Sequence, residues 1–247
     1  MKNPAFTRNA HLFYKLLSKK RVNPERINNL IDLFNDYRIK SIIDIGCGGG
    51  DVTEYLSNNG FNVTGLDNSH QMINIAKQQH ENSKVNWCCE DVMRYKSQEN
   101  FDCATALYSF IQTLPTQNMI NNILSVVENN VNPNFSFIEI QNAEVIKKNY
   151  PFNKQNSWLD DTYKIEAVSK PINRSCYSLE FTISDIISKN VIAVLKHKIF
   201  YFDINKLTSL IKRNGFIIEN IVDSKDFKSS FQSNISSGIG CLIRMKK

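Results

Sequence analysis

The sequence lacks the features that mark membrane, disulfide-bonded and metal-binding proteins. No stretch approaches the roughly 20 apolar residues that a membrane-spanning helix needs, and residues 1–20 hold no apolar run long enough for a signal peptide. The 6 cysteines form no C-x-x-C pair, and the 4 histidines form no cluster that suits a metal. The sequence therefore predicts a cytoplasmic protein with reduced thiols, no membrane contact and no metal site.

Dense positive charge is also missing. The formal net charge is +6, from 30 Lys and Arg against 24 Asp and Glu, but basic pairs such as Lys19-Lys20 and Lys147-Lys148 lie far apart in the sequence. A nucleic-acid footprint needs denser clustering than this, so nucleic acid is not an expected partner. The basic residues belong either to a solvated surface or to the rim of a pocket for an anionic small molecule.

The first 145 residues alternate between patterns typical of strands and of helices. Two helices are expected first, at residues 10–19 and from Asn23-Pro24 onward, the second with proline in its first turn. Apolar runs then predict strands, and periodic segments predict helices between them: strands at 42–45, 61–66, 85–89, 101–107 and 135–140, and helices at 51–57, 70–79 and 117–127. Alternation of this kind predicts parallel pairing in a doubly wound α/β sheet.

The pattern changes after residue 160. Three successive strands without helices between them predict an inserted antiparallel meander at about 160–202: Tyr163–Val168, Cys176–Ile183 and Val191–Phe202, with turns at Pro171–Asn173 and Ser188–Asn190. A helix capped by Asp203 and ending at Asn214-Gly215 follows, and then strands at 216–221 and 239–245. We therefore expect a seven-stranded, mostly parallel sheet in a domain at 37–247, preceded by N-terminal helices at 1–36 that act as a lid.

Alternation along the meander strands predicts two distinct faces. Tyr163, Ile165 and Ala167 are expected on one face, and a second apolar set on another: Leu179, Phe181 and Ile183. One face can then pack on the domain while the other lines a substrate cavity. The alternative is a sheet for homodimer formation, which the Phe and Ile content of the meander would suit.

The clearest motif follows the strand at 42–45, in the segment Asp44-Ile45-Gly46-Cys47-Gly48-Gly49-Gly50. Glycines allow a tight turn and let a ligand contact bare main chain. A dinucleotide-binding G-x-G-x-x-G loop would need glycine at the position of Asp51, and this negative side chain would compete with a pyrophosphate for the helix start. The loop favours a ligand without phosphate at this place, and a plain strand-to-helix turn is the alternative.

Two further acidic positions follow the next two strands. Asp67, followed by Asn68, ends the second strand. A carboxylate at this place can accept hydrogen bonds from both hydroxyls of a ribose. Glu90-Asp91-Val92 follows the third strand, where a carboxylate can accept an adenine amino group, although a simple turn would also explain it. With the glycine loop, these positions predict a nucleoside site at the carboxyl edge of the sheet.

Together these residues resemble the cofactor-binding pattern of the class I S-adenosylmethionine (SAM)-dependent methyltransferases, over about residues 38–145 and again at Leu207–Ile221. The resemblance implies SAM as cofactor, with S-adenosyl-L-homocysteine (SAH) as product, and an antiparallel final pair of strands. It assigns the methionine part of SAM to the glycine loop, the ribose to Asp67 and the adenine to Asp91 and Val92. The implied cofactor-binding set is Asp44, Gly46, Cys47, Gly48, Asp67, Asn68, Met72, Asp91, Val92 and Leu107; for Met72, helix core is an equal alternative.

A finer resemblance concerns the acceptor. The segment Leu107–Ile111, the meander and the closing Ser236–Gly240 look like the N-methyltransferases that act on amino sugars carried on a nucleotide. In that group a histidine thought to act as base often stands where this chain has Thr113. Thr113 cannot take a proton near pH 7, and the neighbouring Gln112 can only orient a substrate.

Three side chains are candidate catalytic residues near the methyl group: Tyr14, Tyr108 and His197. His197 could act as a base, and the two tyrosines could flank the methyl group, with packing as the alternative for each. The predicted function is SAM-dependent methyl transfer to N or O of a small molecule. An RNA or protein methyltransferase of the same fold and a SAM-binding module without catalysis remain as alternatives, while Asp51 argues against NAD.

Overall fold

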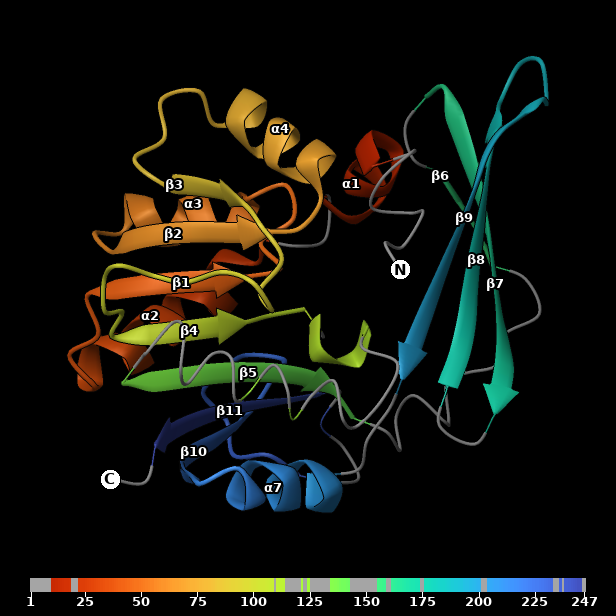
Figure 1. Cartoon of the computed structure of the whole chain (residues 1–247). Coiled ribbons are helices and arrows are strands. Elements are labelled where there is room, and N and C mark those ends of the chain that lie inside the picture. The colour runs from red at the N-terminus through yellow and green to blue at the C-terminus, as the bar shows by residue number, and fades with distance from the viewer. Residues whose placement is uncertain are drawn as a thin grey trace.

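The computed structural model of the chain contains two sheets, and the carboxyl ends of the parallel strands of the larger sheet point toward the smaller one, with α1 (Ala10–Ser18) between them (Figure 1). The structure describes residues 10–18, 22–108, 110–113, 121, 124, 134–142, 155–158, 161–173, 176–200, 204–232, 236 and 238–245. Of the predicted helix at 117–127, only residues 121 and 124 are described, and both are helical. Asp203, the predicted helix cap, lies outside the described residues.

The larger sheet has 7 strands in the order β10-β11-β5-β4-β1-β2-β3. Its strands are β1 (Ser41–Ile45), β2 (Asn62–Asp67), β3 (Asn86–Cys89), β4 (Cys103–Ala106), β5 (Phe135–Gln141), β10 (Phe216–Asp223) and β11 (Gly238–Met245). Neighbours among β1 to β5 pair in parallel, whereas β11 pairs antiparallel with both β5 and β10. This confirms the predicted doubly wound, mostly parallel sheet and its antiparallel final pair.

Local sequence signals set the starts of the helices. The Asn23 side chain accepts a hydrogen bond of 3.3 Å from the Arg26 amide and so caps α2 (Pro24–Asp36). The Ser69 hydroxyl oxygen caps α4 (His70–Gln79) in the same way, at 3.3 Å from the Met72 amide. The two other described helices beside this sheet are α3 (Asp51–Asn58) and α7 (Ile204–Arg213).

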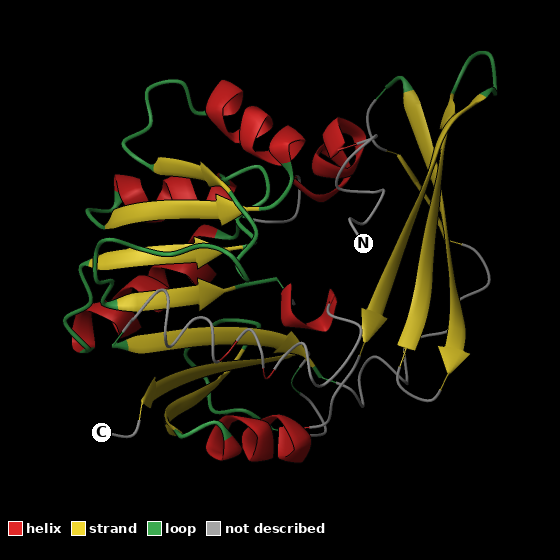
Figure 2. Ribbon diagram, in the orientation of Figure 1, coloured by secondary structure: helices red, strands yellow, loops and turns green. Residues whose placement is uncertain are grey.

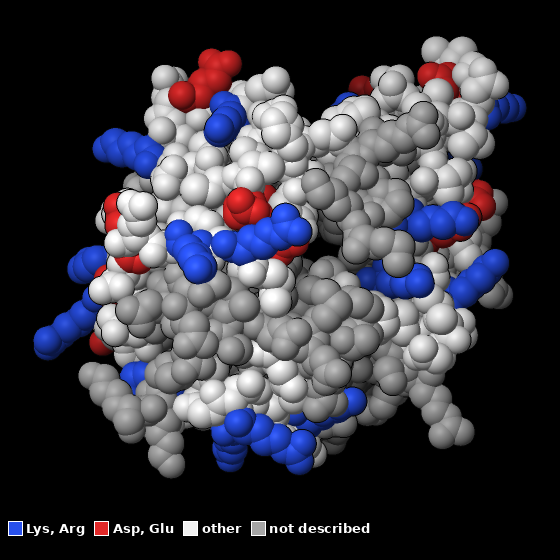
Figure 3. Space-filling model, in the orientation of Figure 1, with Lys and Arg blue, Asp and Glu red and all other residues white. Residues whose placement is uncertain are grey.

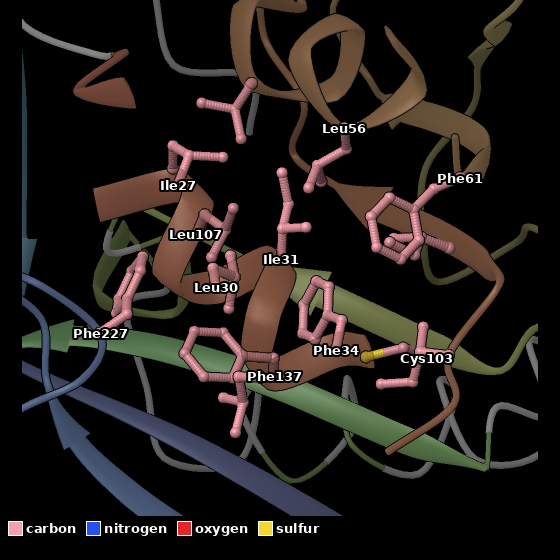
Figure 4. Close-up of a cluster of buried hydrophobic side chains, with 14 of the residues drawn as sticks. Ile27, Leu30, Ile31, Phe34, Leu56, Phe61, Cys103, Leu107, Phe137 and Phe227 are labelled. Carbon is pink, nitrogen blue, oxygen red and sulfur yellow. The ribbon is translucent and has the colours of Figure 1, made fainter. Parts of the chain in front are cut away.

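Apolar side chains cover both faces of the larger sheet. On one face Ile43 and Ile45 of β1 pack in a cluster with Leu207 and Ile211 of α7. On the other face Ile42 lies in a cluster with α2 and α3, where aromatic rings meet edge to face (Figure 4). The ring centroids lie 5.9 Å apart for Phe34 and Phe137, within the usual range of such pairs. Two apolar layers explain why β1 and β4 are buried along almost their whole length.

The smaller sheet is a meander of 4 strands, one more than the sequence predicts. Its strands are β6 (Gln155–Trp158), β7 (Tyr163–Asn173), β8 (Cys176–Asp185) and β9 (Val191–Phe200), each antiparallel to the next (Figure 2). β6 is the added strand. The predicted turn at Pro171–Asn173 is wrong, because these residues continue β7, and residues 174–175 separate the two strands.

The expected division of the meander's apolar residues between two faces is wrong as well. Ile165 pairs directly with Ile183, and Ala167 with Phe181, and directly paired residues point to the same side of a sheet. All of them lie on the inward face, where Ile165 and Ile183 pack against Leu12 of α1. The outward face carries exposed side chains, among them Glu180, Val194 and Lys196.

The N-terminal helices take different places. α2 packs in the core of the larger sheet through Ile27, Leu30 and Phe34, which are fully buried. α1 lies beside α4 and touches the inward face of the meander. Of the two helices grouped at 1–36, only α1 stands between the sheets, where a lid would stand. None of the helices that the structure describes is long and apolar enough to cross a membrane.

Candidate functional site

The glycine loop is fastened to the end of the neighbouring strand. The amides of Gly46 and Cys47 both donate to the carbonyl of Leu66 in β2, at 2.7 and 3.2 Å. Gly46, Gly48 and Gly50 have φ angles of +75°, +59° and +86°, a region that L side chains rarely adopt. The glycines are therefore required by the path of the backbone, which leaves bare main chain at the carboxyl edge of the sheet.

Asp67 is turned toward this loop. Its Oδ2 accepts a hydrogen bond of 3.0 Å from the Gly48 amide, and its Oδ1 accepts one of 2.8 Å from the Ser69 amide. The Asp67 side chain is only partly buried, so its carboxylate can also accept hydrogen bonds from the hydroxyl groups of a ligand. The structure thus brings together the two strongest sequence signals, the glycine loop and the carboxylate predicted for a ribose.

Asp44 holds the strands together from inside the sheet. It is buried, with 4% of its surface exposed, and its two carboxylate oxygens each accept a hydrogen bond of 2.7 Å, from the hydroxyls of Thr53 and Thr105. These bonds join β1 to α3 and β4. Because both oxygens bond to the protein, Asp44 contributes to the site by fixing the loop that follows it.

Cys47 is a buried thiol within the loop. Burial raises its pKa well above the usual value, and the negative charges of Asp67 and Asp44 raise it further. Cys47 therefore stays protonated and contributes its backbone and its volume to the site. All 6 cysteines of the chain are free thiols.

Asp51, which directly follows the glycine loop, is the centre of a polar cluster. Asp51, the first residue of α3, accepts a hydrogen bond of 2.7 Å at Oδ1 from the Tyr14 hydroxyl, and His80 Nε2 lies 3.9 Å from the same oxygen. The His80 ring stacks on Trp87, with ring centroids 6.1 Å apart. Asp51 Oδ2 is buried, and within the described part of the chain it has no hydrogen-bond partner.

The other predicted cofactor residues divide into a surface group and a buried group. Asn68 is exposed, and Asp91 is partly buried and accepts a hydrogen bond of 3.0 Å from the Met93 amide in the turn after β3. Val92, Met72 and Leu107 are buried in apolar clusters, Met72 completely and together with α1 and the meander. The buried position of Met72 agrees with the helix-core alternative.

Tyr14 reaches the glycine loop from α1. A Cβ added to Gly49 would collide with the Tyr14 ring, so the ring lies directly on the bare backbone of Gly49. Its hydroxyl is held by Asp51 at the start of α3. α1 therefore contacts the predicted cofactor loop, as a lid would.

Tyr108 is held in a strained conformation by a buried ion pair. It follows β4 with a φ of +50°, and its amide donates to Glu139 Oε2 at 2.8 Å. Glu139 Oε1 lies 2.5 Å from Arg26, whose guanidinium also lies 5.1 Å from the centre of the Tyr108 ring. Arg26 and Glu139 are 8% and 7% exposed. A strained residue fixed by a desolvated pair at the edge of a sheet is typical of functional sites.

His197 belongs to β9 of the meander, and η2 (Phe110–Thr113) is the short helix that follows β4. His197 pairs with Leu179 on the inward face of the meander and is partly buried, and β9 runs beside η2. Gln112 is fully buried and binds the backbone of Gln141 at both ends of its amide, at 2.7 and 3.2 Å. Both ends of its side-chain amide are therefore bonded to the fold. The Thr113 hydroxyl donates to the Phe110 carbonyl at 2.7 Å.

Sequence reasoning missed two features of the site. The Phe110 ring lies on Gly46 as closely as Tyr14 lies on Gly49, and the Arg26–Glu139 pair joins α2 to β5 over more than a hundred residues. Phe110 stands in the quoted segment after β4, where an aromatic residue two positions beyond Tyr108 could have been considered. Nothing in the sequence indicates that Arg26 and Glu139 form a buried ion pair, because a lone charged residue on a helix or in a strand is usually solvated.

Charged side chains do not mark a basic acceptor pocket. Figure 3 shows Lys and Arg spread over the visible face, with Asp and Glu among them. In the meander, Lys196 lies on the outward face, where it pairs with Glu180 at 3.0 Å. On this face the charges of the described residues are mixed in sign.

Comparison with known proteins agrees with this geometry. Residues 42–130 match the family described as methyltransferase domain. The chain is 31% identical over 110 residues to a ubiquinone biosynthesis O-methyltransferase from Coxiella burnetii, a match that covers 43% of this chain and 47% of the relative. The chain thus spans about half the length of the curated relatives it matches.

Likeness to solved structures extends over both sheets. A SAM-dependent methyltransferase from Clostridium acetobutylicum superposes with a TM-score of 0.82 at 15% identity, over 97% of this chain and 98% of that one. The SAM-bound amino pentose methyltransferase CalS10 from Micromonospora echinaspora superposes with a TM-score of 0.70 at 14% identity, over 94% and 96%. At these identities the likeness describes the fold, including the inserted meander.

Proposed function

We propose that the chain is a class I SAM-dependent methyltransferase that methylates N or O of a small molecule; the match of residues 42–130 to a methyltransferase domain and the fold both support this. The observation that carries the proposal is the hydrogen bond from the Gly48 amide to Asp67. It joins a bare backbone loop to a carboxylate suited to a ribose. SAM has no phosphate, and its methionine ammonium and sulfonium are compatible with Asp51 at the end of this loop.

The residues present are of the kinds that would bind SAM. Gly46 and Gly48 offer main chain to the methionine part, and Asp67 accepts the ribose hydroxyls. Asp91 and the backbone at Val92 are assigned to the adenine, because they follow β3 at the same edge. When bound, SAM supplies a methyl group already activated by the sulfonium. The protein therefore has to orient the acceptor, exclude water and remove a proton.

Among the three candidate catalytic residues, the geometry favours His197 as the base. The Tyr14 hydroxyl donates to Asp51, and the Tyr108 ring lies beside Arg26, so both tyrosines are bound to structural partners. His197 stands on the inward face of the meander, in the strand that runs beside η2, and imidazole is the side chain among the three candidates best suited to accept a proton near neutral pH. We assign it the proton that the acceptor loses.

The meander supports a small acceptor. It faces the carboxyl edge of the larger sheet and packs on α1, which narrows the access that an RNA or a protein chain would need. Because the likeness to an amino pentose methyltransferase covers 94% of the chain, we propose an amino sugar carried on a nucleotide as the first acceptor to test. A phenol is the second, because the relative from Coxiella burnetii is an O-methyltransferase.

The proposal is tested first by binding and then by transfer. Calorimetry with SAM, SAH and NADH should give binding of the first two and none of the third. Labelled SAM is then incubated with nucleotide-linked amino sugars, phenols, RNA and protein, and label should enter a small molecule. Binding of NADH alone would contradict the cofactor, label in RNA or protein would contradict the acceptor class, and SAM binding without transfer to any of these would favour a non-catalytic module.

A further inference from the structure

Two aromatic rings stand on the glycine loop, one from each side. The Tyr14 ring covers Gly49, and the Phe110 ring covers Gly46, each so closely that a Cβ on the glycine would collide with it. The rings come from distant parts of the chain, α1 and the short helix after β4. Their convergence on one loop is therefore a tertiary feature of the site.

The electrostatic surroundings of these rings favour a cation. Ring faces carry negative potential, and Asp51 adds a carboxylate that accepts a hydrogen bond of 2.7 Å from the Tyr14 hydroxyl. The second oxygen of Asp51 is buried, and no hydrogen-bond donor among the described residues reaches it. A positive charge at the loop would be attracted by both the rings and this carboxylate, whereas a neutral group of the same shape would gain little.

The cofactor assigned to this loop changes its charge during the reaction. In SAM the sulfonium sulfur is bonded both to C5′ of the ribose and to the methionine chain, so it would stand between the part assigned to Asp67 and the part assigned to the glycine loop. On transfer, the bond from methyl carbon to sulfur breaks and its electron pair stays on sulfur. A bond forms from the methyl carbon to the acceptor N or O, and the acceptor's proton leaves to a base or to water. The sulfonium becomes a neutral thioether.

We propose that Tyr14 and Phe110 form an aromatic clamp that binds the sulfonium of SAM in preference to the thioether of SAH. This proposal rests on the proposed function and adds a selectivity device to it. Cation–π contacts are worth about 2- to 30-fold in affinity, depending on how far the cation is desolvated. The clamp would hold SAM before transfer and release SAH after it, which limits inhibition by the product.

Phe110→Leu is the first variant for testing the clamp. The Phe110 ring is partly buried and borders an apolar cavity of about 20 Å³ lined in part by Ile45 and Ala106, so leucine keeps an apolar side chain there. Calorimetry should show SAM binding weakened about 2- to 30-fold, while SAH affinity changes by less than about 2-fold. Sinefungin, which carries an ammonium in place of the sulfonium, should follow SAM.

Tyr14 supplies an independent test and a matched pair. Tyr14→Leu removes the ring and should lower the ratio of SAM to SAH affinity, as Phe110→Leu does. Tyr14→Phe keeps the ring and removes only the hydroxyl bond to Asp51, so the ratio should be retained. Phe61→Leu, behind the sheet in the α2 cluster, serves as a control that should alter neither affinity.

The possible outcomes separate the clamp from the proposed function. Wild-type protein that binds neither SAM nor SAH would overturn both. Normal binding of both by wild type, with equal weakening of SAM and SAH in the Phe110 and Tyr14 leucine variants, would overturn the clamp and leave the methyltransferase proposal standing. If Phe110→Leu does not fold by circular dichroism, the ratio measured for Tyr14→Leu against Tyr14→Phe decides.

Discussion

The two sheets of this protein are built under different constraints. In the larger sheet, β1 and β4 are buried on both faces, whereas in β9 of the meander buried and exposed residues alternate. A strand covered on both sides can accept few substitutions, because each side chain has packed neighbours. The larger sheet thus forms a rigid platform for the glycine loop, while the meander is free to vary outside its inward face.

The same contrast appears in their ion pairs. Arg26 and Glu139 form a desolvated pair between α2 and β5, with side chains 10% and 9% exposed. Lys196 and Glu180 form a pair across the outward face of the meander, with side chains 68% and 41% exposed. Water screens the second pair and not the first, so the two test how differently the sheets depend on charge.

The largest effect is expected for Glu139→Ala. It leaves the Arg26 guanidinium buried without its carboxylate and removes the acceptor of the Tyr108 amide. We expect the free energy of unfolding to fall by about 3–5 kcal/mol, measured by urea denaturation. A loss below about 1 kcal/mol would mean that the buried pair adds no more than a surface pair does.

Asp67→Ala should act on the cofactor more than on the fold. The carboxylate faces the glycine loop at 3.0 Å from the Gly48 amide, and its loss should weaken SAM binding by roughly 1.5–3 kcal/mol in calorimetry. Asp185→Ala is the matched control in the meander, where the carboxylate accepts the Ser188 amide at 2.7 Å far from the loop. Unchanged SAM affinity in Asp67→Ala would rule out its ribose assignment.

His197→Ala tests whether the inward face of the meander serves the acceptor. We expect kcat/KM to fall at least about tenfold, or about 1.4 kcal/mol, with SAM affinity unchanged. Val194→Ala, on the outward face of the same strand, should leave kinetics unchanged. Normal kinetics with altered sedimentation of His197→Ala would instead identify the meander as a homodimer surface.

The smallest effect is expected for Glu180→Ala. The pair with Lys196 is solvated on both sides, so the free energy of unfolding should change by about 0–1 kcal/mol in the same urea titration. Measured beside Glu139→Ala, it gives the ratio between an ion pair in the platform and one in the meander. Similar losses for the two variants would remove the proposed difference between the sheets.

Sequence reasoning succeeded where local pattern determines structure. The glycine loop, the proline in the first turn of α2 and the succession of β1 to β5 follow from short-range signals, and all of them are found in the structure. The place of Asp67 beside the glycine loop could be predicted because strand ends in parallel sheets meet at one edge.

The missed features depend on contacts between distant segments. The side on which Phe181 and Ile183 lie depends on their pairing with β7, and a strand pattern alone gives alternation without register. Phe110 meets Gly46, and Arg26 meets Glu139, only after the chain has folded. Such positions cannot be derived from periodicity, because no local rule distinguishes a buried ion pair from two solvated charges.

The space beside Gly50 and Gly65 is filled by the indole of Trp87, so the back of the glycine loop carries a fluorophore. The chain has 2 tryptophans, and the other, Trp158, belongs to β6 of the meander. With Trp158→Phe, the emission of Trp87 alone would follow occupancy of the loop in real time, without any attached label.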